Sequence, residues 1–169
     1  YDQLVSYGEI LSSIIISKYL NSIGLKTKWV DARSCVKTDE YYRDANVDFK
    51  KTSKSIKRKI KCKGLYVSQG FIGSNSKSFT TTLGREGSDY SAAIFAHALN
   101  AESVTIWKDV RGVLNADPRY FNKTKLLNKI SYEEAIELAF YGASVIHPKT
   151  LQPLKKKKIP LFVKSFLTP

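Results

Sequence analysis

The chain contains 169 residues, and its hydrophobic fraction of 43%, with 12% aromatic residues, is sufficient to bury the core of one soluble globular domain. The longest aliphatic run, residues 14–16, is far shorter than the ~20 apolar residues of a membrane span, so we expect no membrane partner. Cys35 and Cys62 do not form a CxxC pair, which predicts no disulfide framework, no metal site and a reduced, cytoplasmic location.

The formal net charge of +13 is concentrated in two basic runs, residues 50–63 and 155–158. Within the first run, Ile56 and Ile60 stand at i and i+4, which predicts a short helix with its apolar side chains on the core and its lysines in water. No aromatic residue lies between these lysines as a platform for stacking bases. We therefore expect a solvated basic surface and no nucleic-acid partner.

The first half of the chain predicts a helix followed by strands. Apolar residues recur near helical spacing between residues 9 and 23, and Gly24 provides a stop, so we predict a largely buried helix over 9–23. Extended apolar segments at residues 28–30 and 65–67 predict two strands. The Ser/Thr-rich stretch of residues 70–82 is predicted to be a loop.

The second half predicts further helices and strands in alternation. Ser88 is a suitable N-cap for an alanine-rich helix, and a strand over residues 104–107 follows it. Ser131 and Glu134 form an S-x-x-E capping box for the next helix, and Gly142 is placed as its C-terminal cap.

The last predicted elements complete the fold class. Pro148 suits the first turn of a helix that ends before Ile159, and residues 161–163 predict the final strand. Helices that alternate with almost continuously apolar strands are typical of an α/β sandwich built on a mainly parallel sheet.

One segment of the chain combines several features that suit anions. A glycine-rich turn at residues 70–73 follows a predicted strand and leads to a hydroxyl cluster, Arg85 and a helix start with Ser88 and Asp89. Ligands of α/β sheets bind at the carboxyl ends of strands, and free N–H groups at a helix start accept phosphate or carboxylate oxygens. The guanidinium of Arg85 can hold a carboxylate through two parallel hydrogen bonds.

Two strings in this segment, Gly-Phe-Ile-Gly at residues 70–73 and Thr-Thr-Leu-Gly-Arg-Glu-Gly-Ser-Asp-Tyr-Ser-Ala-Ala at residues 81–93, resemble the central signature of the aspartokinase family. The Ser-Tyr-Gly-Glu string at residues 6–9 is similar to another family motif. Further similarity continues in order at residues 109–112, 117–119, 130–135 and 142–150.

The resemblance implies the amino-acid kinase fold, a three-layer α/β sandwich with a mainly parallel central sheet, the amino acid in one half and ATP in the other. It implies an enzyme that uses ATP and Mg²⁺ to phosphorylate the side-chain carboxylate of L-aspartate, giving 4-aspartyl phosphate for lysine, threonine and methionine biosynthesis. A cytoplasmic homodimer is the corresponding expectation for the full-length protein.

By the same resemblance, Glu9 binds the α-ammonium group of aspartate and Phe71 lines the pocket. Arg85 and Ser88 bind the carboxylates, and Arg85 also belongs to the catalytic set. Asp89 organises catalysis by orienting lysines, because an aspartate beside two anions would otherwise repel them.

The resemblance also places an ATP site in the second half of the chain. This sequence departs from the family there, with Lys108 where a threonine is usual, Leu114 where an aromatic residue is common, and Ser144 where a lysine faces the phosphates. Lys149 is a candidate replacement for that lysine, whereas His147 and His97 are interpreted as structural. The predicted ATP-binding residues are Lys108, Asp109, Leu114, Arg119, Ser144, Val145 and Lys149.

Family members open their kinase domain with a first strand and a Lys-x-Gly-Gly-Thr-Ser loop, and no such string occurs here. We therefore interpret residues 1–169 as a partial kinase domain without that loop or the regulatory domains, and we expect this chain alone to be inactive.

Other functions remain open at this point. Glutamate 5-kinase and acetylglutamate kinase are close relatives by fold, but Glu9 in its Ser-Tyr-Gly context favours aspartokinase over them. The chain could also belong to the kinase half of a bifunctional aspartokinase–homoserine dehydrogenase. A non-catalytic nucleotide-binding module is the alternative from another functional class.

Overall fold

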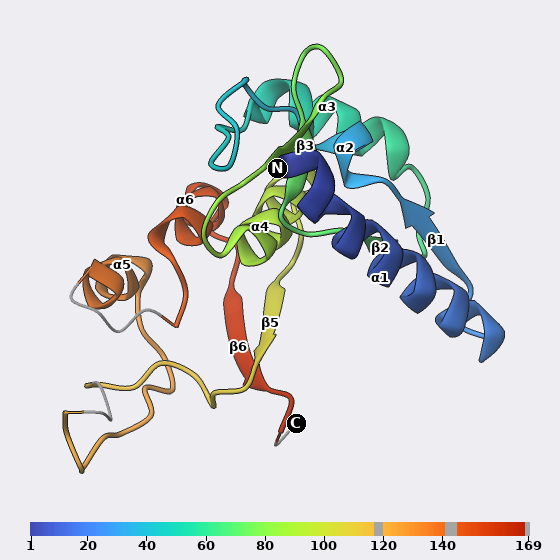
Figure 1. Ribbon diagram of the computed structural model, residues 1–169. Coiled ribbons are helices and arrows are strands. Elements are labelled where there is room, and N and C mark those ends of the chain that lie inside the picture. Colours follow the sequence, from blue (N-terminus) through green and yellow to red (C-terminus); the bar gives the residue numbers. More distant parts are fainter. Residues whose placement is uncertain (117–119, 141–144, 168–169) are drawn as a thin grey trace. The chain divides into compact units, whose positions relative to one another are not determined.

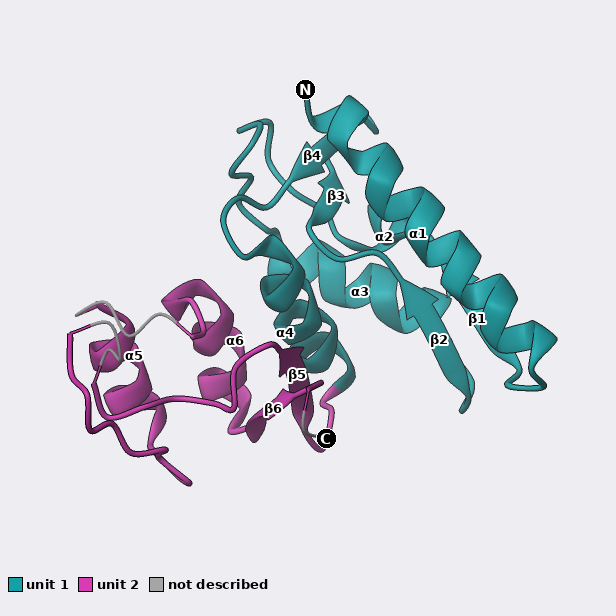
Figure 2. Cartoon of the chain, turned by 60° about the horizontal axis from the view of Figure 1, so that its bottom comes forward, with its two compact units in different colours: residues 1–99 teal, residues 100–169 magenta. Residues whose placement is uncertain are grey.

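The computed structural model describes residues 1–116, 120–140 and 145–167, and the chain divides into two compact units, Tyr1–Leu99 and Asn100–Pro169 (Figure 2). Each unit contains helices and its own parallel pair of strands, which confirms the predicted α/β class.

The first unit contains one parallel and one antiparallel pair of strands (Figure 1). β1 (Thr27–Val30) pairs in parallel with β2 (Leu65–Ser68), and both strands lie where the apolar segments predicted them. β3 (Ile72–Ser74) pairs antiparallel with β4 (Thr80–Thr82). The helices of this unit are α1 (Asp2–Ser22), α2 (Ala32–Cys35), α3 (Phe49–Lys59) and α4 (Gly87–Leu99).

The core of the first unit is formed by the helices and the segment before α4. Val36, Ile56, Leu83 and Ile94 are fully buried in one cluster. His97 packs edge-on against Phe49 with ring centroids 5.3 Å apart, which agrees with its structural interpretation.

The second unit is built on β5 (Val104–Lys108) and β6 (Leu161–Ser165), which pair in parallel. α5 (Tyr132–Phe140) begins with the predicted capping box, since the amide of Ser131 donates to Glu134 Oε2 and the amide of Glu134 donates to Ser131 Oγ. Gly142, its predicted C-cap, lies outside the described residues.

The start of α6 (Pro148–Lys157) agrees with the prediction from Pro148. His147 is the N-cap, and its Nδ1 accepts a hydrogen bond of 3.1 Å from the amide of Lys149. Lys158 ends the helix in a left-handed conformation, before Ile159 as predicted. His147 therefore has the structural role assigned to it.

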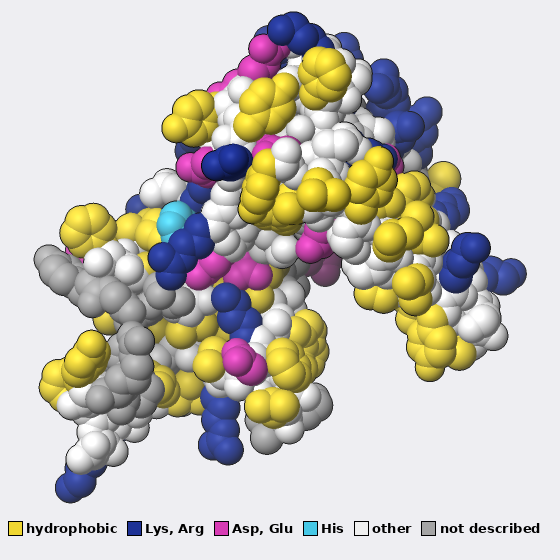
Figure 3. Space-filling view, viewed as in Figure 1, with side chains coloured by type: hydrophobic (Ala, Val, Ile, Leu, Met, Phe, Trp, Pro, Cys, Tyr) yellow, Lys and Arg dark blue, Asp and Glu magenta, His cyan; other side chains and the backbone are white. Residues whose placement is uncertain are grey.

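The prediction for the first helix was correct in type but wrong in burial and start. α1 begins at Asp2, and the side chains packed inward are Asp2, Ser6, Ser13 and Ser17. Its apolar side chains face outward along the helix, as the space-filling view shows (Figure 3). The exposed apolar residues of α1 are Leu4, Tyr7, Leu11, Ile15, Ile16 and Tyr19, and Ile23 follows them.

A physical reason for this orientation lies in the serines. The hydroxyls of Ser6 and Ser13 donate to helix carbonyls three residues earlier, at 2.8 and 2.9 Å, so their polar groups are satisfied within the helix. Because serine is small, α1 can lie close against β1, β2 and β4.

The segment of residues 70–82, predicted to be a loop, instead contains the β3–β4 hairpin. All three threonines of β4 are buried, and Asp2 Oδ2 accepts hydrogen bonds from the amide and the hydroxyl of Thr82 at 2.8 and 3.2 Å. Threonine is a good strand former, and here its hydroxyls find buried partners. A composition typical of loops therefore concealed a strand.

The predicted basic helix is confirmed as α3, with Ile56 buried and the lysines mainly outward. Because these charges are solvated, we expect DNA binding by this chain to be weak, independent of sequence and lost at moderate salt. Fluorescence anisotropy with two unrelated duplexes over a salt series measures this. Sub-micromolar binding that persists at physiological ionic strength would contradict the prediction.

No helix among the described residues is long and apolar enough to cross a bilayer.

Candidate functional site

Two glycines bring the residue 70–73 turn against the start of α4. A Cβ atom added to Gly70 would lie 2.8 Å from Ser88 Cα, and one added to Gly87 would lie 2.7 Å from Phe71 Cδ2. These separations are too short for any side chain larger than hydrogen, so the two backbones are in direct contact. The structure thereby places Gly70 against Ser88 and Phe71 against Gly87.

The backbone of Phe71 is held from both sides. Phe71 has a φ of +69°, a left-handed conformation that is unusual for a bulky residue. Its amide donates to Ser91 Oγ at 2.8 Å, and its carbonyl accepts from the amide of Leu83 at 2.9 Å. Ser91 Oγ in turn donates to the Gly87 carbonyl at 2.8 Å. Strained backbone that is fixed in this way is typical of functional sites.

Ser91 was not among the predicted site residues. It is buried, with 3% of its surface exposed, and lies one turn after Gly87 on the inner face of α4. The sequence does show a polar residue next to alanines on a predicted helix. It does not show that Ser91 would bind the distant backbone of Phe71.

Arg85 lies in the short segment between β4 and α4. The amide of Gly87 donates to the Gly84 carbonyl at 3.1 Å, which closes a turn around Arg85, and the Arg85 side chain is exposed. Gly84 has a φ of +77°, and a Cβ added there would lie 2.3 Å from Asp44 Oδ1. The Asp44 side chain therefore packs directly against Gly84 in this turn.

The start of α4 was predicted two residues too late. α4 begins at Gly87, so Ser88 is its second residue rather than its N-cap. Ser88 is exposed and Asp89 is half-buried, and both lie in the first turn, where free amides favour an anion.

Tyr90 and Glu9 complete the surroundings of this segment. Burial raises the pKa of Tyr90 to about 12, and the Asp44 charge adds to the effect, so its hydroxyl stays neutral. Glu9 is half-buried on α1, on the same helix face as the inward-facing Ser6 and Ser13.

A hollow of about 510 Å³ adjoins the contact between Gly70 and Ser88. Ser88 is among its lining residues, whereas Glu9, Phe71 and Arg85 are not. The other side chains around it include Ile60, Phe95 and Leu99 from α3 and α4 or their ends. Lys63, Tyr66 and Ser68 also line it, so its polar groups come from the segment between α3 and β2 and from β2 as well as from α4.

The residues that were predicted to bind ATP, where the structure describes them, all belong to the second unit. Lys108 ends β5, where its carbonyl accepts from the amide of Phe166 at 3.0 Å, and Asp109 is exposed just after it. Leu114 forms a bridge with Leu126, and Lys149 is the second residue of α6. Val145 is half-buried just before that helix, and Arg119 and Ser144 lie outside the described residues.

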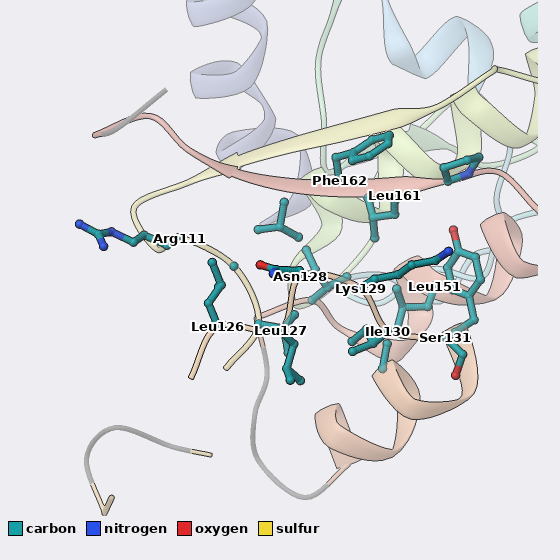
Figure 4. Close-up of a pocket in the computed structure, with 17 residues that line it drawn as sticks. Arg111, Leu126, Leu127, Asn128, Lys129, Ile130, Ser131, Leu151, Leu161 and Phe162 are labelled. Atoms are coloured by element: carbon teal, nitrogen blue, oxygen red, sulfur yellow. The ribbon is translucent and has the colours of Figure 1, made fainter. Parts of the chain in front are cut away.

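The second unit also contains a cavity of about 570 Å³ that the sequence did not predict (Figure 4). Leu127, Ile130, Leu151 and Leu161 contribute apolar side chains to its wall, and the guanidinium of Arg111 points away from it. Lys108, Asp109, Leu114, Val145 and Lys149 do not line this cavity. The described residues among those predicted to bind ATP thus lie outside it.

This chain is similar to known proteins over almost its whole length. The amino acid kinase family model matches residues 1–165. The chain is 40% identical to lysine-sensitive aspartokinase 3 of Escherichia coli (strain K12), covering 99% of this chain and 38% of that protein. It is 38% identical to the bifunctional aspartokinase/homoserine dehydrogenase of Buchnera aphidicola, covering 96% of this chain and 20% of that protein.

The structural comparison agrees with these similarities. The crystal structure of E. coli aspartokinase III in complex with aspartate and ADP matches with a TM-score of 0.92 and 40% identity, over 97% of this chain and 37% of that chain. The chain thus spans less than two fifths of the length of these relatives. Since the family model covers residues 1–165, the chain belongs to the amino acid kinase family.

Proposed function

We propose that the full-length protein carrying this chain is an aspartate kinase, which transfers the terminal phosphoryl group of MgATP to the side-chain carboxylate of L-aspartate. The observation that carries this proposal is the contact between the Gly70–Phe71 turn and the start of α4, with Arg85 in the adjoining turn. The similarity to relatives named aspartokinase, one of them solved with aspartate and ADP, supports the same substrates.

The chemistry fits these residues. The attacking carboxylate of aspartate is already ionised at neutral pH, so the enzyme needs no general base and must align two anions. Arg85, Ser88 and the free amides of α4 are donors for the substrate carboxylates, and Glu9 is a partner for the ammonium group. Asp89 is proposed to orient lysines at the phosphoryl group.

The second unit is proposed to bind the nucleotide through residues at the end of β5 and the start of α6. In the described part of the chain, no three or more His, Cys, Asp and Glu side chains cluster to hold a metal. We propose that Mg²⁺ is carried by the nucleotide phosphates, its usual partners in kinases. Residues 1–169 are proposed as part of the kinase domain of a cytoplasmic homodimer.

A coupled ADP-release assay on the full-length protein tests the function directly. Turnover with L-aspartate, and none with L-glutamate or N-acetylglutamate, is the expected result. Turnover with either glutamate substrate and not with aspartate would identify another amino-acid kinase. Absence of turnover with all three, although the folded protein binds nucleotide, would favour the non-catalytic module. The full-length sequence decides whether a homoserine dehydrogenase domain is present.

In the full-length protein, Arg85→Lys is expected to raise the KM for aspartate about tenfold, because an ammonium group cannot reproduce the two parallel bonds of guanidinium. Initial rates at varied aspartate and saturating ATP measure this effect. Arg58→Lys in the exposed basic helix α3 is the matched control and should leave that KM unchanged. An unchanged KM in Arg85→Lys would remove Arg85 from the carboxylate site.

A further inference from the structure

The inward face of α1 is a polar stripe that contains Glu9. Asp2, Ser6, Glu9, Ser13 and Ser17 follow one another at intervals of three or four residues, so they share one helix face. Every member except Glu9 is at most 5% exposed. The direction of Glu9 is therefore set by how its neighbours on this face are attached to the rest of the unit.

Ser13 joins this stripe to β1 and to the residue that follows β2. Ser13 Oγ accepts a hydrogen bond of 2.7 Å from Gln69 Nε2 and one of 3.0 Å from Trp29 Nε1, and it donates to the Ile10 carbonyl at 2.9 Å. A hydroxyl has one donor and two acceptor positions, so all hydrogen-bonding positions of the Ser13 hydroxyl are occupied.

Gln69 is the other half of this junction. Only 3% of its surface is exposed, and its Oε1 accepts from the amide of Ala32 at 2.7 Å. Both ends of the amide side chain are thus occupied, one by α1 and the other by the start of α2. A buried network with all its groups satisfied is rigid and specifies one arrangement.

The junction lies between two residues of the proposed aspartate site. Ser13 stands one helical turn after Glu9, and Gln69 directly precedes Gly70 and Phe71. A single hydrogen bond of 2.7 Å therefore connects the helix that carries the ammonium partner to the turn that lines the pocket.

We propose that Gln69 and Ser13 are positioning residues that set the place of Glu9 relative to the Gly70–Phe71 turn, and so determine the affinity for the amino-acid substrate. This inference rests on the proposed function. Neither side chain needs to touch aspartate: Gln69 and Ser13 act through Glu9 and Phe71. Since their contacts lie within the first unit, the effect is expected on the amino acid and not on the nucleotide.

Ser13→Ala in the full-length protein tests the inference. It removes the acceptor of the Gln69 and Trp29 hydrogen bonds, so α1 can shift, and small shifts of binding groups cost up to about 10²-fold. We expect the KM for aspartate to rise about 10-fold or more, with the KM for ATP unchanged. Calorimetric titration with aspartate should show the same weakening of binding.

Ser17→Ala is the matched control. Ser17 is 5% exposed against 4% for Ser13, and its hydroxyl lies 3.0 Å from Thr27 Oγ1, two turns beyond Glu9. The two variants should lower the melting temperature similarly, while only Ser13→Ala raises the KM for aspartate. A Ser13→Ala enzyme with the KM values of Ser17→Ala would overturn the inference.

A second variant tests the same hydrogen bond from its other end. Gln69→Met is similar in length but cannot donate to Ser13, and it should repeat the effect on aspartate alone. If Ser13→Ala does not fold, the KM values of Gln69→Met decide whether the inference holds. Equal changes in the KM for aspartate and in the KM for ATP would contradict a positioning role. A wild-type protein without aspartate kinase activity would instead refute the proposed function, so the two failures are distinct.

Discussion

Lys149→Ala in the full-length protein is expected to lower kcat by about 10²-fold. The transferring phosphoryl group carries charge that cations must neutralise, and loss of such a donor typically costs ~2.7–4 kcal/mol of transition-state stabilisation. The family resemblance places a lysine where this chain has Ser144, and we propose Lys149 as its substitute. Lys149 is half-buried in the first turn of α6, whose start is fixed by His147 and Pro148.

Steady-state kinetics at saturating aspartate measures this effect, with Lys156→Ala on the exposed end of the same helix as the control. Adding Ser144→Lys to Lys149→Ala should restore part of the lost kcat. If Lys149→Ala retains the wild-type kcat and KM for ATP, then Mg²⁺ and Arg119 are sufficient, and the missing lysine is not replaced from α6.

Gly70→Ala should have an effect of similar size on the other substrate, raising the KM for aspartate by about 10²-fold. The new Cβ would lie 2.8 Å from Ser88 Cα and 2.9 Å from Ser88 Cβ. Because the closer obstacle is backbone, the turn itself must move away from the start of α4. Gly70 and Ser88 would then no longer lie together.

Gly73→Ala controls for general loss of packing. Its Cβ would lie 3.0 Å from both Thr38 Cγ2 and the Val36 carbonyl oxygen, neither of which belongs to the predicted site. We expect both variants to lower the melting temperature, but only Gly70→Ala to weaken aspartate binding. A Gly70→Ala enzyme with an unchanged KM for aspartate would show that this contact does not shape the site.

The starts of α5 and α6 were predictable because their signals are local. Ser131 and Glu134 form a reciprocal cap within one turn, and Pro148 constrains only its own backbone and its neighbour's. The strands at β1, β2, β5 and β6 were likewise visible as short apolar runs. Each of these features depends on residues close together in the sequence.

The burial of α1 and the β3–β4 hairpin depended on distant partners, so neither was predictable. Nothing near Ser13 indicates that Gln69 and Trp29 will bind its hydroxyl, and nothing near Thr82 indicates Asp2. Periodicity identifies a helix face but does not say which face turns inward when small polar residues can be satisfied there.

The residues of the candidate site also divide into those that local sequence signals identified and those that depend on distant contacts. The glycines, Arg85 and Ser88 were identified from one continuous segment of the sequence. The structure shows that the two ends of this segment, the Gly70–Phe71 turn and the start of α4, are in contact. Ser91, Gln69 and Asp44 were missed because each acts on a residue elsewhere in the chain. Positioning residues of this kind are recognised only when the contacts are known.

The outward apolar face of α1 also governs how this chain behaves in solution. Such a long apolar stripe attracts other copies, while a net charge of +13 keeps them apart. Screening shortens the reach of that repulsion from ~10 Å at 0.1 M salt to ~3 Å at 1 M, and leaves the attraction intact. Kosmotropic salts strengthen the attraction as well. We therefore expect this chain to remain dispersed best in dilute buffer and to aggregate as salt is added.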